Sequence, residues 1–234
     1  MNARRLALLQ EMGLAPVWRL GRAPTGEAQP PVEAPDASSS AETGMPGVAR
    51  MGWTELRATV QACTACELCK TRTQTVFGVG NTEADWMIIG EAPGAEEDAR
   101  GEPFVGQAGR LLDNMLASIG LSRQKNVYIA NVLKCRPPGN RNPEAQEIER
   151  CAPFLARQIE LVQPKLLIAM GRFAAQTLLN TDASIASLRG KRHRYNGVPM
   201  IVTYHPAYLL RNLADKAKAW EDLCFARATM KTLQ

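Results

Sequence analysis

Five cysteines lie in two short segments of this 234-residue chain, and their thiols are the first groups whose spacing suggests chemistry. Cys63 and Cys66 form a CxxC pair, Cys69 follows three residues later, and Cys135 and Cys151 are separated by fifteen residues. Four thiolates from two segments can hold either a zinc ion or an iron–sulfur cluster. Because structural zinc usually uses two tight pairs and only one is present, the spacing favours a cluster.

Three questions about the thiols stay open at this level. Cys69 could replace Cys66 as a ligand, since both lie at short spacing from Cys63. Unrelated buried thiols are the alternative to a metal site, although the grouping near Cys63 disfavours it. Cys224 stands alone in a helical pattern over residues 220–230, and we expect it in the core.

Polar or glycine-containing segments end four apolar runs further along the chain. They are the GEAPG segment at residues 90–94, Asn131, Gly171 and the pair His205-Pro206. In open α/β sheets, ligands bind beyond the carboxyl ends of the parallel strands. If the four runs are strands, these segments should therefore converge on one crevice.

The runs that end in these segments have the length and composition of buried strands. They cover residues 86–89, 127–133, 166–170 and 200–204, and amphipathic helical patterns cover residues 107–119, 143–162 and 172–179. Alternating strands and helices indicate a mainly parallel sheet with helices on both faces. The sequence therefore predicts an α/β fold, a three-layer α/β/α sandwich with a mainly parallel, four-stranded central sheet.

The first fifty residues differ in composition from the rest. Residues 21–50 hold five of the fifteen prolines and no aromatic residue, which is typical of a linker. Before them, residues 4–14 show a loose helical pattern that ends near Gly13. We therefore predict an N-terminal extension over residues 1–52, with a possible short helix, and one domain over residues 53–234.

Composition excludes some classes of protein. The chain is 45% hydrophobic and 22% charged, and it has no run of about twenty apolar residues that would span a membrane. Its net charge of +5 is compatible with a polyanionic partner but does not require one. Free cysteines without a secretory signal favour a cytoplasmic location.

Five motifs in order resemble those of the family 4 uracil-DNA glycosylases, the iron–sulfur branch of the uracil-DNA glycosylase superfamily. The resemblance covers about residues 60–230 and rests on CTACEL, VFGVGN, GEAPGAEEDARGEPFVGQAGRLLDNML, YIANVLKCRPPGNRNP and YHPAYLLRN. It implies hydrolysis of the N-glycosidic bond of uracil in single- or double-stranded DNA, by a monomer, to leave an abasic site. It also implies a 4Fe-4S cluster held by Cys63, Cys66, Cys135 and Cys151, with Cys69 at a variable position.

The resemblance gives roles to three residues that follow or end strands. It implies that Phe104 stacks on the flipped uracil, that Asn131 reads N3–H and O4 of the base, and that His205 donates a hydrogen bond to O2. Each also has a structural alternative: a core phenylalanine, a loop-capping asparagine and a histidine satisfied within its own loop.

The carboxylates of the GEAPG motif are harder to assign. We favour Glu97 as the partner of the attacking water or the sugar, with Glu91 next, and Glu91 is also our candidate for the wall that excludes thymine. Ala92 stands where other uracil glycosylases carry an aspartate. Glu96 and Asp98 can be explained by favourable charge at a helix start.

The resemblance also implies contacts with DNA. Backbone amides from Gly90 to Gly94, including Ala92, and the side chains of Arg136, Arg141 and Arg211 are expected near phosphates. Leu209 or Leu210 could enter the stack where the base leaves, as apolar wedges do in proteins that distort a duplex. Either leucine could equally pack in the core.

Two other functions compete with this interpretation of the sequence. A noncatalytic four-cysteine nucleic-acid-binding module, such as an accessory of a DNA polymerase, gives no reason for Phe104, Asn131 and His205 at strand ends. A relative that traps its abasic product covalently needs a histidine-bearing insertion after the second strand. Here Asn131 runs directly into VLKCRPPGNRNP, without such an insertion.

Overall fold

The computed structural model describes residues 47–233 of the chain. The helix predicted over residues 4–14 and most of the linker predicted over residues 21–50 lie outside the described residues. The first described element is the short helix η1 (Val48–Arg50). Val48 is 2% exposed and packs with Leu56 of α2 (Trp53–Gln61) and with Phe154, so the domain described here includes residues before Trp53.

Six strands form one mixed sheet in the order β1-β3-β2-β4-β6-β5. They are β1 (Val79–Gly80), β2 (Trp86–Gly90), β3 (Val127–Asn131), β4 (Leu166–Met170), β5 (Arg192–Tyr195) and β6 (Val198–Thr203). The four inner strands β3, β2, β4 and β6 are parallel, and β1 and β5 pair antiparallel at the edges. The α/β fold with four parallel strands is confirmed, and two edge strands are added to it.

The edge strands lack the pattern of buried strands for physical reasons. β1 has only two residues, one of them a glycine, and β5 reads RHRY. Exposed Arg192 and Arg194 on β5 give the sheet a charged edge, which discourages pairing with another chain. Short and charged segments of this kind resemble loops in sequence.

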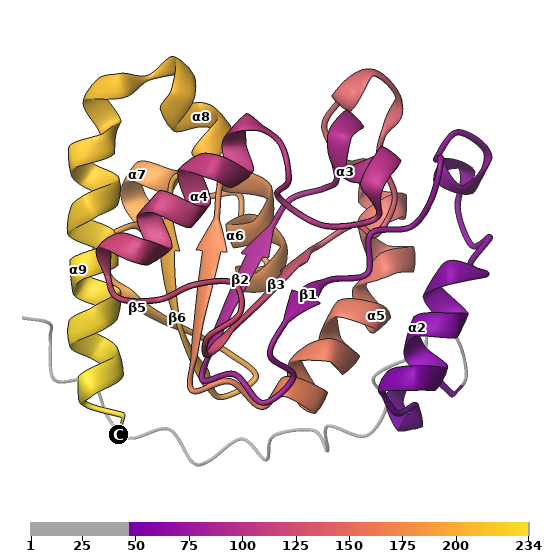
Figure 1. Ribbon diagram of the computed structural model, residues 1–234, viewed down its shortest axis with the longest axis horizontal. Helices are drawn as coiled ribbons and strands as arrows, with labels where there is room; N and C mark the ends of the chain where they lie inside the picture. The colour runs from indigo at the N-terminus through magenta and orange to yellow at the C-terminus, as the bar shows by residue number, and fades with distance from the viewer. Residues whose placement is uncertain (1–46, 234) are drawn as a thin grey trace, which may run out of the picture. The chain divides into compact units, whose positions relative to one another are not determined.

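Helices cover both faces of the sheet, as Figure 1 shows for α4 and α9 on one side and α5 on the other. The helices after α2 are α3 (Ala95–Arg100), α4 (Gln107–Ser118), α5 (Ala145–Val162), α6 (Arg172–Leu179), α7 (Ile185–Leu188), α8 (Pro206–Arg211) and α9 (Lys216–Lys231), with short turns η2 (Glu67–Lys70), η3 (Pro138–Asn140) and η4 (Leu213–Asp215). Successive strand residues alternate between the two layers: Met87 packs with α5 and α6, whereas Ile88 packs with α4 and α9. The three-layer α/β/α arrangement follows.

The pairing register brings the carboxyl ends of the parallel strands to one level. Gly90 at the end of β2 pairs with Asn131 at the end of β3, and Met170 at the end of β4 pairs with Thr203 at the end of β6. The arrow of β2 points toward the end of the domain at which α3 and α8 lie (Figure 1). Residues that follow the strands are therefore gathered at this one edge.

Candidate active site

A pocket of about 750 Å³ opens at the carboxyl edge of the parallel strands. All four strands contribute to its lining: Glu91 follows β2, Asn131 ends β3, Gly171 follows β4 and His205 lies beyond the end of β6. Phe104, from the loop between α3 and α4, lines the same pocket. The predicted convergence of the strand-end segments on one crevice is confirmed.

Phe104 and Asn131 meet over Gly90. A Cβ atom on Gly90 would lie 2.4 Å from Asn131 Oδ1 and 2.6 Å from Phe104 Cζ, so only glycine leaves room for both side chains. Phe104 adopts a φ of +56°, which is uncommon for a bulky residue and persists only where neighbours hold it. Arg123 does so by donating hydrogen bonds to the carbonyl oxygens of Pro103 and Phe104.

The side chain of Asn131 is buried without a partner for its oxygen. Asn131 is 2% exposed, and among residues 47–233 nothing donates a hydrogen bond to Oδ1. A buried amide oxygen without a hydrogen bond costs about 1 to 3 kcal/mol, so such groups in native structures usually have a functional reason. Because Asn131 lines the pocket, a ligand with an N–H group would supply the missing bond.

His205 is held in one tautomer by the start of α8. Its Nδ1 accepts a hydrogen bond from the backbone N–H of Ala207 at 3.1 Å, so the ring proton lies on Nε2. Burial lowers the pKa of His205 to about 4, although Glu97 nearby opposes the shift. The imidazole is therefore a neutral hydrogen-bond donor at physiological pH, and its ring centroid lies 5.4 Å from that of Phe104.

A buried network supports the segment that carries His205. Thr203, at the end of β6, donates to Asp222 Oδ2 at 2.9 Å, and Arg189 donates to the same oxygen at 3.0 Å. The backbone N–H of Gly171 donates to the carbonyl oxygen of Thr203. Asp222 on α9 and Arg189, directly after α7, therefore hold Thr203 in place, two residues before His205.

Glu91 is the carboxylate of the pocket whose charge is most affected by its surroundings. Burial raises the pKa of Glu91 to about 7, and the exposed Arg172 opposes this shift. A carboxyl group with a pKa near neutrality is a candidate for acid or base chemistry.

Glu97 lies in the same pocket but is engaged by backbone amides. Its Oε1 accepts hydrogen bonds from the N–H groups of Val105 and Gly106, and its Oε2 accepts one from Gly94. These bonds join the GEAPG loop to the loop that presents Phe104. They favour a positioning role for Glu97, so its role as water partner stays a prediction and Glu91 moves ahead of it.

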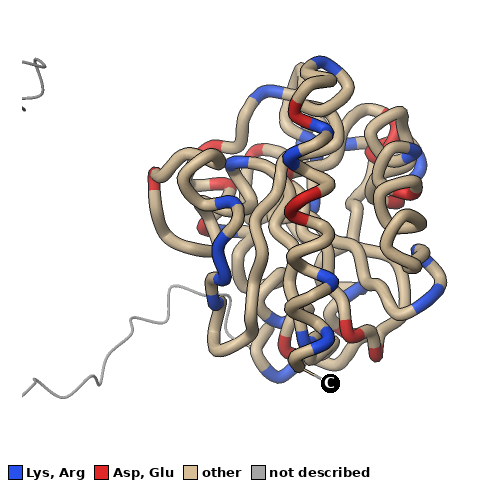
Figure 2. The backbone as a smooth tube through the Cα atoms, turned by 90° about the vertical axis from the view of Figure 1, so that its left-hand side faces the viewer, with Lys and Arg blue, Asp and Glu red and all other residues tan. Residues whose placement is uncertain are grey.

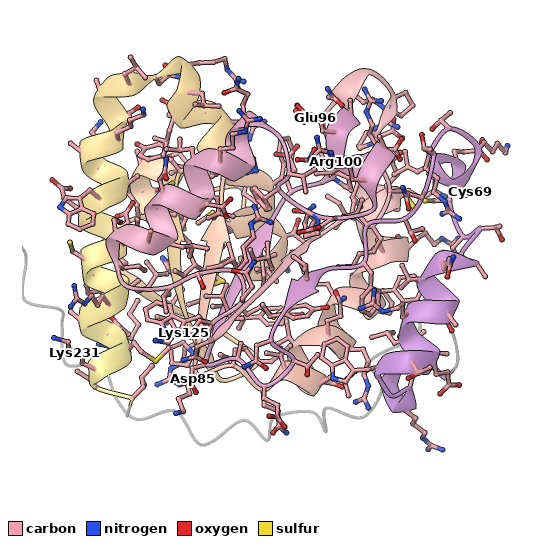
Figure 3. The ribbon with its side chains drawn as sticks, viewed as in Figure 1. Cys69, Asp85, Glu96, Arg100, Lys125 and Lys231 are labelled. Atoms are coloured by element: carbon pink, nitrogen blue, oxygen red, sulfur yellow. The ribbon has the colours of Figure 1, made fainter. Side chains whose placement is uncertain are left out.

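The other two acidic residues of this motif act within the fold. Glu96 pairs with Arg100 one turn later on α3, at the surface (Figure 3). Asp98 is buried, and the backbone N–H of Thr73 donates to its carboxylate, 3.0 Å from each of the two oxygens. Asp98 therefore joins α3 to the segment that follows the first three cysteines.

The five cysteines of the two sequence segments line one small cavity of about 20 Å³ beside α5. The lining thiols are Cys63, Cys66, Cys69, Cys135 and Cys151. Figure 3 shows further sulfur atoms beside the labelled Cys69. Since Cys69 joins the four predicted ligands, the choice between Cys66 and Cys69 stays open. Cys224 is exposed on α9, so the expectation that it lies in the core is wrong.

The surroundings of the cavity suit sulfur ligands that carry negative charge. Arg72 donates a hydrogen bond to Cys135 Sγ at 3.0 Å, and the backbone N–H of Lys134 donates to Cys151 Sγ at 3.3 Å. Within residues 47–233, no three His, Cys, Asp or Glu side chains are arranged to hold a single metal ion.

Comparison with known proteins identifies the family. Residues 77–224 match the model of the uracil DNA glycosylase superfamily. A protein of Archaeoglobus fulgidus named type-4 uracil-DNA glycosylase is 48% identical over 159 residues, which cover 64% of this chain and 79% of that protein. A protein of Thermotoga maritima with the same name, type-4 uracil-DNA glycosylase, is 42% identical over 176 residues, which cover 74% of this chain and 91% of that protein. This chain belongs to the type-4 uracil-DNA glycosylase family.

In this type-4 family member, one of the residues predicted to contact DNA is misassigned. Leu209 is 1% exposed and packs in the core with α4 and α9, so the prediction that it enters the DNA stack is wrong. The direction of α8 turns Leu209 inward, whereas Leu210, the next residue, is 39% exposed. Arg211 is exposed at the end of α8 and lines the pocket.

Arg136 and Arg141, which were predicted to contact phosphates, have protein partners. Arg141 donates two hydrogen bonds to the carboxylate of Glu147, at 3.0 and 2.5 Å, so its charge is already paired although it lines the pocket. Arg136 donates to Asn140 Oδ1 at 2.7 Å. Contact of either arginine with a phosphate stays a prediction.

Some pocket residues of this family member were missed by the sequence analysis. Arg172 directly follows the predicted strand-end Gly171, so its position could have marked it. Tyr204 and Tyr208 line the pocket with their rings stacked 5.1 Å apart, and Tyr208 donates to Asp215 at 2.7 Å. Tyr204 lies before the N-cap of α8, so no helical spacing in the sequence marked this contact.

Charge on the face that carries α9 is mixed. Figure 2 shows basic and acidic positions along this helix, so α9 offers no track of a single sign to a polyanion. No helix among residues 47–233 is long and apolar enough to span a membrane.

Proposed function

We propose that this chain is a uracil-DNA glycosylase, which extrudes uracil from DNA into the pocket and hydrolyses the bond between N1 of the base and C1′ of the sugar. The observation that carries the proposal is the unpartnered Oδ1 of buried Asn131, in a pocket shared with a neutral histidine and an aromatic ring. These are the groups needed to contact the edge of a pyrimidine, its ring face and the O2 oxygen on which charge collects as the base departs.

Asn131 reads the edge of the base. Uracil offers a donor at N3–H and an acceptor at O4, and a side-chain amide can accept from the first and donate to the second. Neutral cytosine has an acceptor at N3, so it would leave Asn131 Oδ1 without a bond. A polar group left unpaired in this way discriminates strongly between two bases of similar shape.

Phe104 offsets part of the cost of taking the base out of the helix. Unstacking and unpairing a nucleotide costs a few kcal/mol, and least for a mispaired or single-stranded base. Stacking of a base on an aromatic side chain returns about 1 to 3 kcal/mol. The ring of Phe104, held over Gly90, is our candidate for this surface.

His205 stabilises the departing base. As the glycosidic bond breaks, negative charge collects on uracil, in part on O2, and the Nε2–H of a neutral imidazole can donate to that oxygen. Removal of one such donor typically costs about 10²- to 10³-fold in rate. The low pKa of His205 supports donation by the neutral ring, with no need for a proton transfer from it.

A carboxylate completes the reaction on the sugar side. Loss of the base leaves a cationic sugar, water adds its oxygen to C1′, and the proton lost by the water balances the charge of the departing base. We assign the carboxylate that orients this water to Glu91, because both oxygens of Glu97 accept backbone hydrogen bonds. Glu91 is also our candidate for the wall that meets the methyl group of thymine.

Uracil-containing DNA, single- or double-stranded, is the partner implied by this activity. We propose that Arg211 and Arg136 contact phosphates, that Leu210 fills the space left by the extruded base, and that amides of the GEAPG loop, between Gly90 and Gly94, bind the backbone beside it. We also propose that the enzyme acts as a monomer in the cytoplasm.

The cysteine cavity is our candidate for a 4Fe-4S cluster held by Cys63, Cys66, Cys135 and Cys151. The N–H donors to sulfur support this choice, and so does the presence of only one tight CxxC pair, since structural zinc usually uses two. Bound there, the cluster would supply a covalent link between the N-terminal cysteine segment and the loop that leads from Asn131. Brown visible absorbance with iron and sulfide analysis would support it, and active, colourless, zinc-loaded protein would refute it.

Cleavage of a labelled oligonucleotide tests the activity. The protein is incubated with strands that carry uracil, cytosine or thymine at one position, and abasic sites are converted to breaks by alkali. We expect scission of the uracil strand only. Cluster-loaded protein that binds these strands but gives no scission would favour a noncatalytic nucleic-acid-binding module.

Variants of the pocket test the assignments within that assay. His205→Ala and Asn131→Ala are each expected to lower kcat about 100-fold or more, because each removes one contact to the base in a buried site. Matched controls are His193→Ala, at the edge strand β5, and Asn114→Ala, exposed on α4, which should keep the wild-type rate. Full activity of both pocket variants would refute the pocket assignment.

A further inference from the structure

Lys134 is a buried lysine between the base pocket and the cysteine cavity. It is 1% exposed, and its Nζ donates to the carbonyl oxygen of Asn131 at 2.7 Å and to Gln158 Oε1 at 2.6 Å. Both acceptors are neutral, and Lys134 forms no ion pair with a carboxylate of residues 47–233. Burial of an ammonium group with no countercharge costs several kcal/mol, so its position needs a reason.

The contacts of its backbone join Lys134 to the cysteine cavity. Its N–H donates to Cys151 Sγ at 3.3 Å, and its carbonyl oxygen accepts from the N–H of Val76 at 2.8 Å. Lys134 also precedes Cys135 directly and lines the cavity itself. Lys134 therefore contacts the wall of the cavity through its backbone and the end of β3 through its side chain.

Gln158 fixes the other side of the ammonium group. It is fully buried on α5, and its Nε2 donates to the carbonyl oxygen of Phe77 at 2.9 Å and lies 3.3 Å from the hydroxyl oxygen of Tyr128. Its Oε1 is thereby oriented toward Lys134 Nζ. The lysine head is thus held between a rigid helix and the end of β3.

We propose that Lys134 is a positioning residue for Asn131, which links the cysteine cavity to the base pocket and holds the base-reading amide in place. This inference rests on the proposed function. The bond to the carbonyl oxygen fixes the backbone of Asn131, and therefore the direction in which its side chain leaves the strand. Since Asn131 Oδ1 approaches Gly90 closely, small movements of this backbone change where the amide meets the base.

A double-mutant cycle separates this role from general structural support. Kinetics under single-turnover conditions are compared for wild type, Lys134→Met, Asn131→Ala and the double variant, each loaded with iron to the same extent. Lys134→Met should lower the single-turnover rate constant at saturation about 10- to 100-fold, with a smaller change in the half-saturating concentration, because it misplaces a group that acts in the transition state. In the Asn131→Ala background the same change should have less than about a twofold effect.

A second readout does not depend on activity. The N–H groups of Val132 and Leu133 donate to the carbonyl oxygens of Gly90 and Glu91, at 3.0 Å each. Amide hydrogen exchange of the peptide that contains them should become faster in Lys134→Met. The control is Lys165→Met, which removes a half-exposed lysine paired with Asp85 at the amino end of the sheet and should change neither readout.

Lys134→Arg keeps the charge but cannot repeat both bonds of the ammonium group, so it tests the inference even where the methionine variant fails to hold iron. Lys134→Arg should retain iron and its visible absorbance, yet lose kcat in the same direction. The inference would be overturned if Lys134→Met slowed cleavage by the same factor in the wild-type and the Asn131→Ala backgrounds. Unchanged hydrogen exchange in Lys134→Met would also overturn it. Wild-type protein that fails to cleave uracil-containing DNA would instead refute the proposed function.

Discussion

Glu91 and His205 line one pocket, and burial favours the neutral form of both. It raises the pKa of Glu91 to about 7 and lowers the pKa of His205 to about 4. At neutral pH the histidine is therefore fully uncharged, whereas the carboxyl group is near its midpoint. The two groups are thereby suited to different tasks: a fixed neutral donor to the base, and a carboxylate for the water and the cationic sugar.

The pH dependence of kcat/KM follows from these two values. If ionised Glu91 orients the water, kcat/KM should rise about tenfold per pH unit below pH 7 and level off above it, since the carboxylate form predominates above its pKa. His205 should add no break between pH 5 and 9, because its pKa lies below this window. Initial rates at low substrate across this range measure the profile.

Glu91→Gln is the matched variant for this profile. It removes the ionisable group and keeps the shape of the side chain, so kcat/KM should be low and independent of pH through 7. If kcat/KM of Glu91→Gln rose with pH as it does in the wild type, the titrating group would be another residue.

The sequence predicted which residues line the pocket where those residues belong to a recognisable motif. Phe104, Asn131 and His205 do line one pocket, because strand-end residues of a parallel sheet share an edge. The choice between Leu209 and Leu210 was not predictable, since it depends on the rotation of α8 about its axis. The hydrogen bonds of Glu97 to two loops were not predictable either, because the sequence does not show whether a carboxylate contacts water or backbone amides.

At the scale of elements, the site depends on the register between β2 and β3. The pairing of Gly90 with Asn131 brings the amide of Asn131 opposite a residue without a side chain. The four inner strands were predictable, since buried parallel strands are nearly continuous apolar runs. The edge strands β1 and β5 were not, because a two-residue strand and the sequence RHRY carry no such run.

Gly90→Ala tests this register. The added Cβ would lie within 2.6 Å of Phe104 Cζ and closer still to Asn131 Oδ1, so both side chains must move into the pocket. A displacement of about 1 Å in a positioned group can cost about 100-fold, and we expect a loss of that order in kcat/KM. Uracil-strand cleavage under single-turnover conditions measures it.

Gly52→Ala serves as the control for that substitution. Gly52 has a φ of −79° and no atom within 4 Å of an added Cβ, so both activity and thermal stability should be kept. Wild-type activity of Gly90→Ala would contradict the proposed pocket floor.

At the scale of the whole molecule, the described domain contains both candidate centres. Among the described residues, those that line the pocket and the cysteine cavity all follow Val48, and α2 packs against α5 beside the cavity. The boundary predicted near Met51 came from composition alone. Composition cannot reveal that a single valine before the boundary contributes to the core, because burial depends on tertiary contacts.

Two truncated chains test the extent of the domain. A chain that begins at Gly47 should keep kcat/KM within about twofold and its unfolding temperature, since no described contact is lost. A chain that begins at Trp53 loses buried Val48 and the bond from Arg157 to the carbonyl oxygen of Met51. Its free energy of unfolding, measured by urea titration, should fall by about 1.5 to 3 kcal/mol. Equal stability of the two chains would contradict this boundary.

The central claim is that one pocket binds the ring face, the N3–H edge and the O2 oxygen of uracil through three side chains. A crystal structure with uracil bound tests it most directly. We predict the ring stacked on Phe104, N3–H within hydrogen-bond distance of Asn131 Oδ1, and O2 within the same distance of His205 Nε2. Uracil bound elsewhere, or bound in this pocket with Asn131 Oδ1 still unpartnered, would contradict the account.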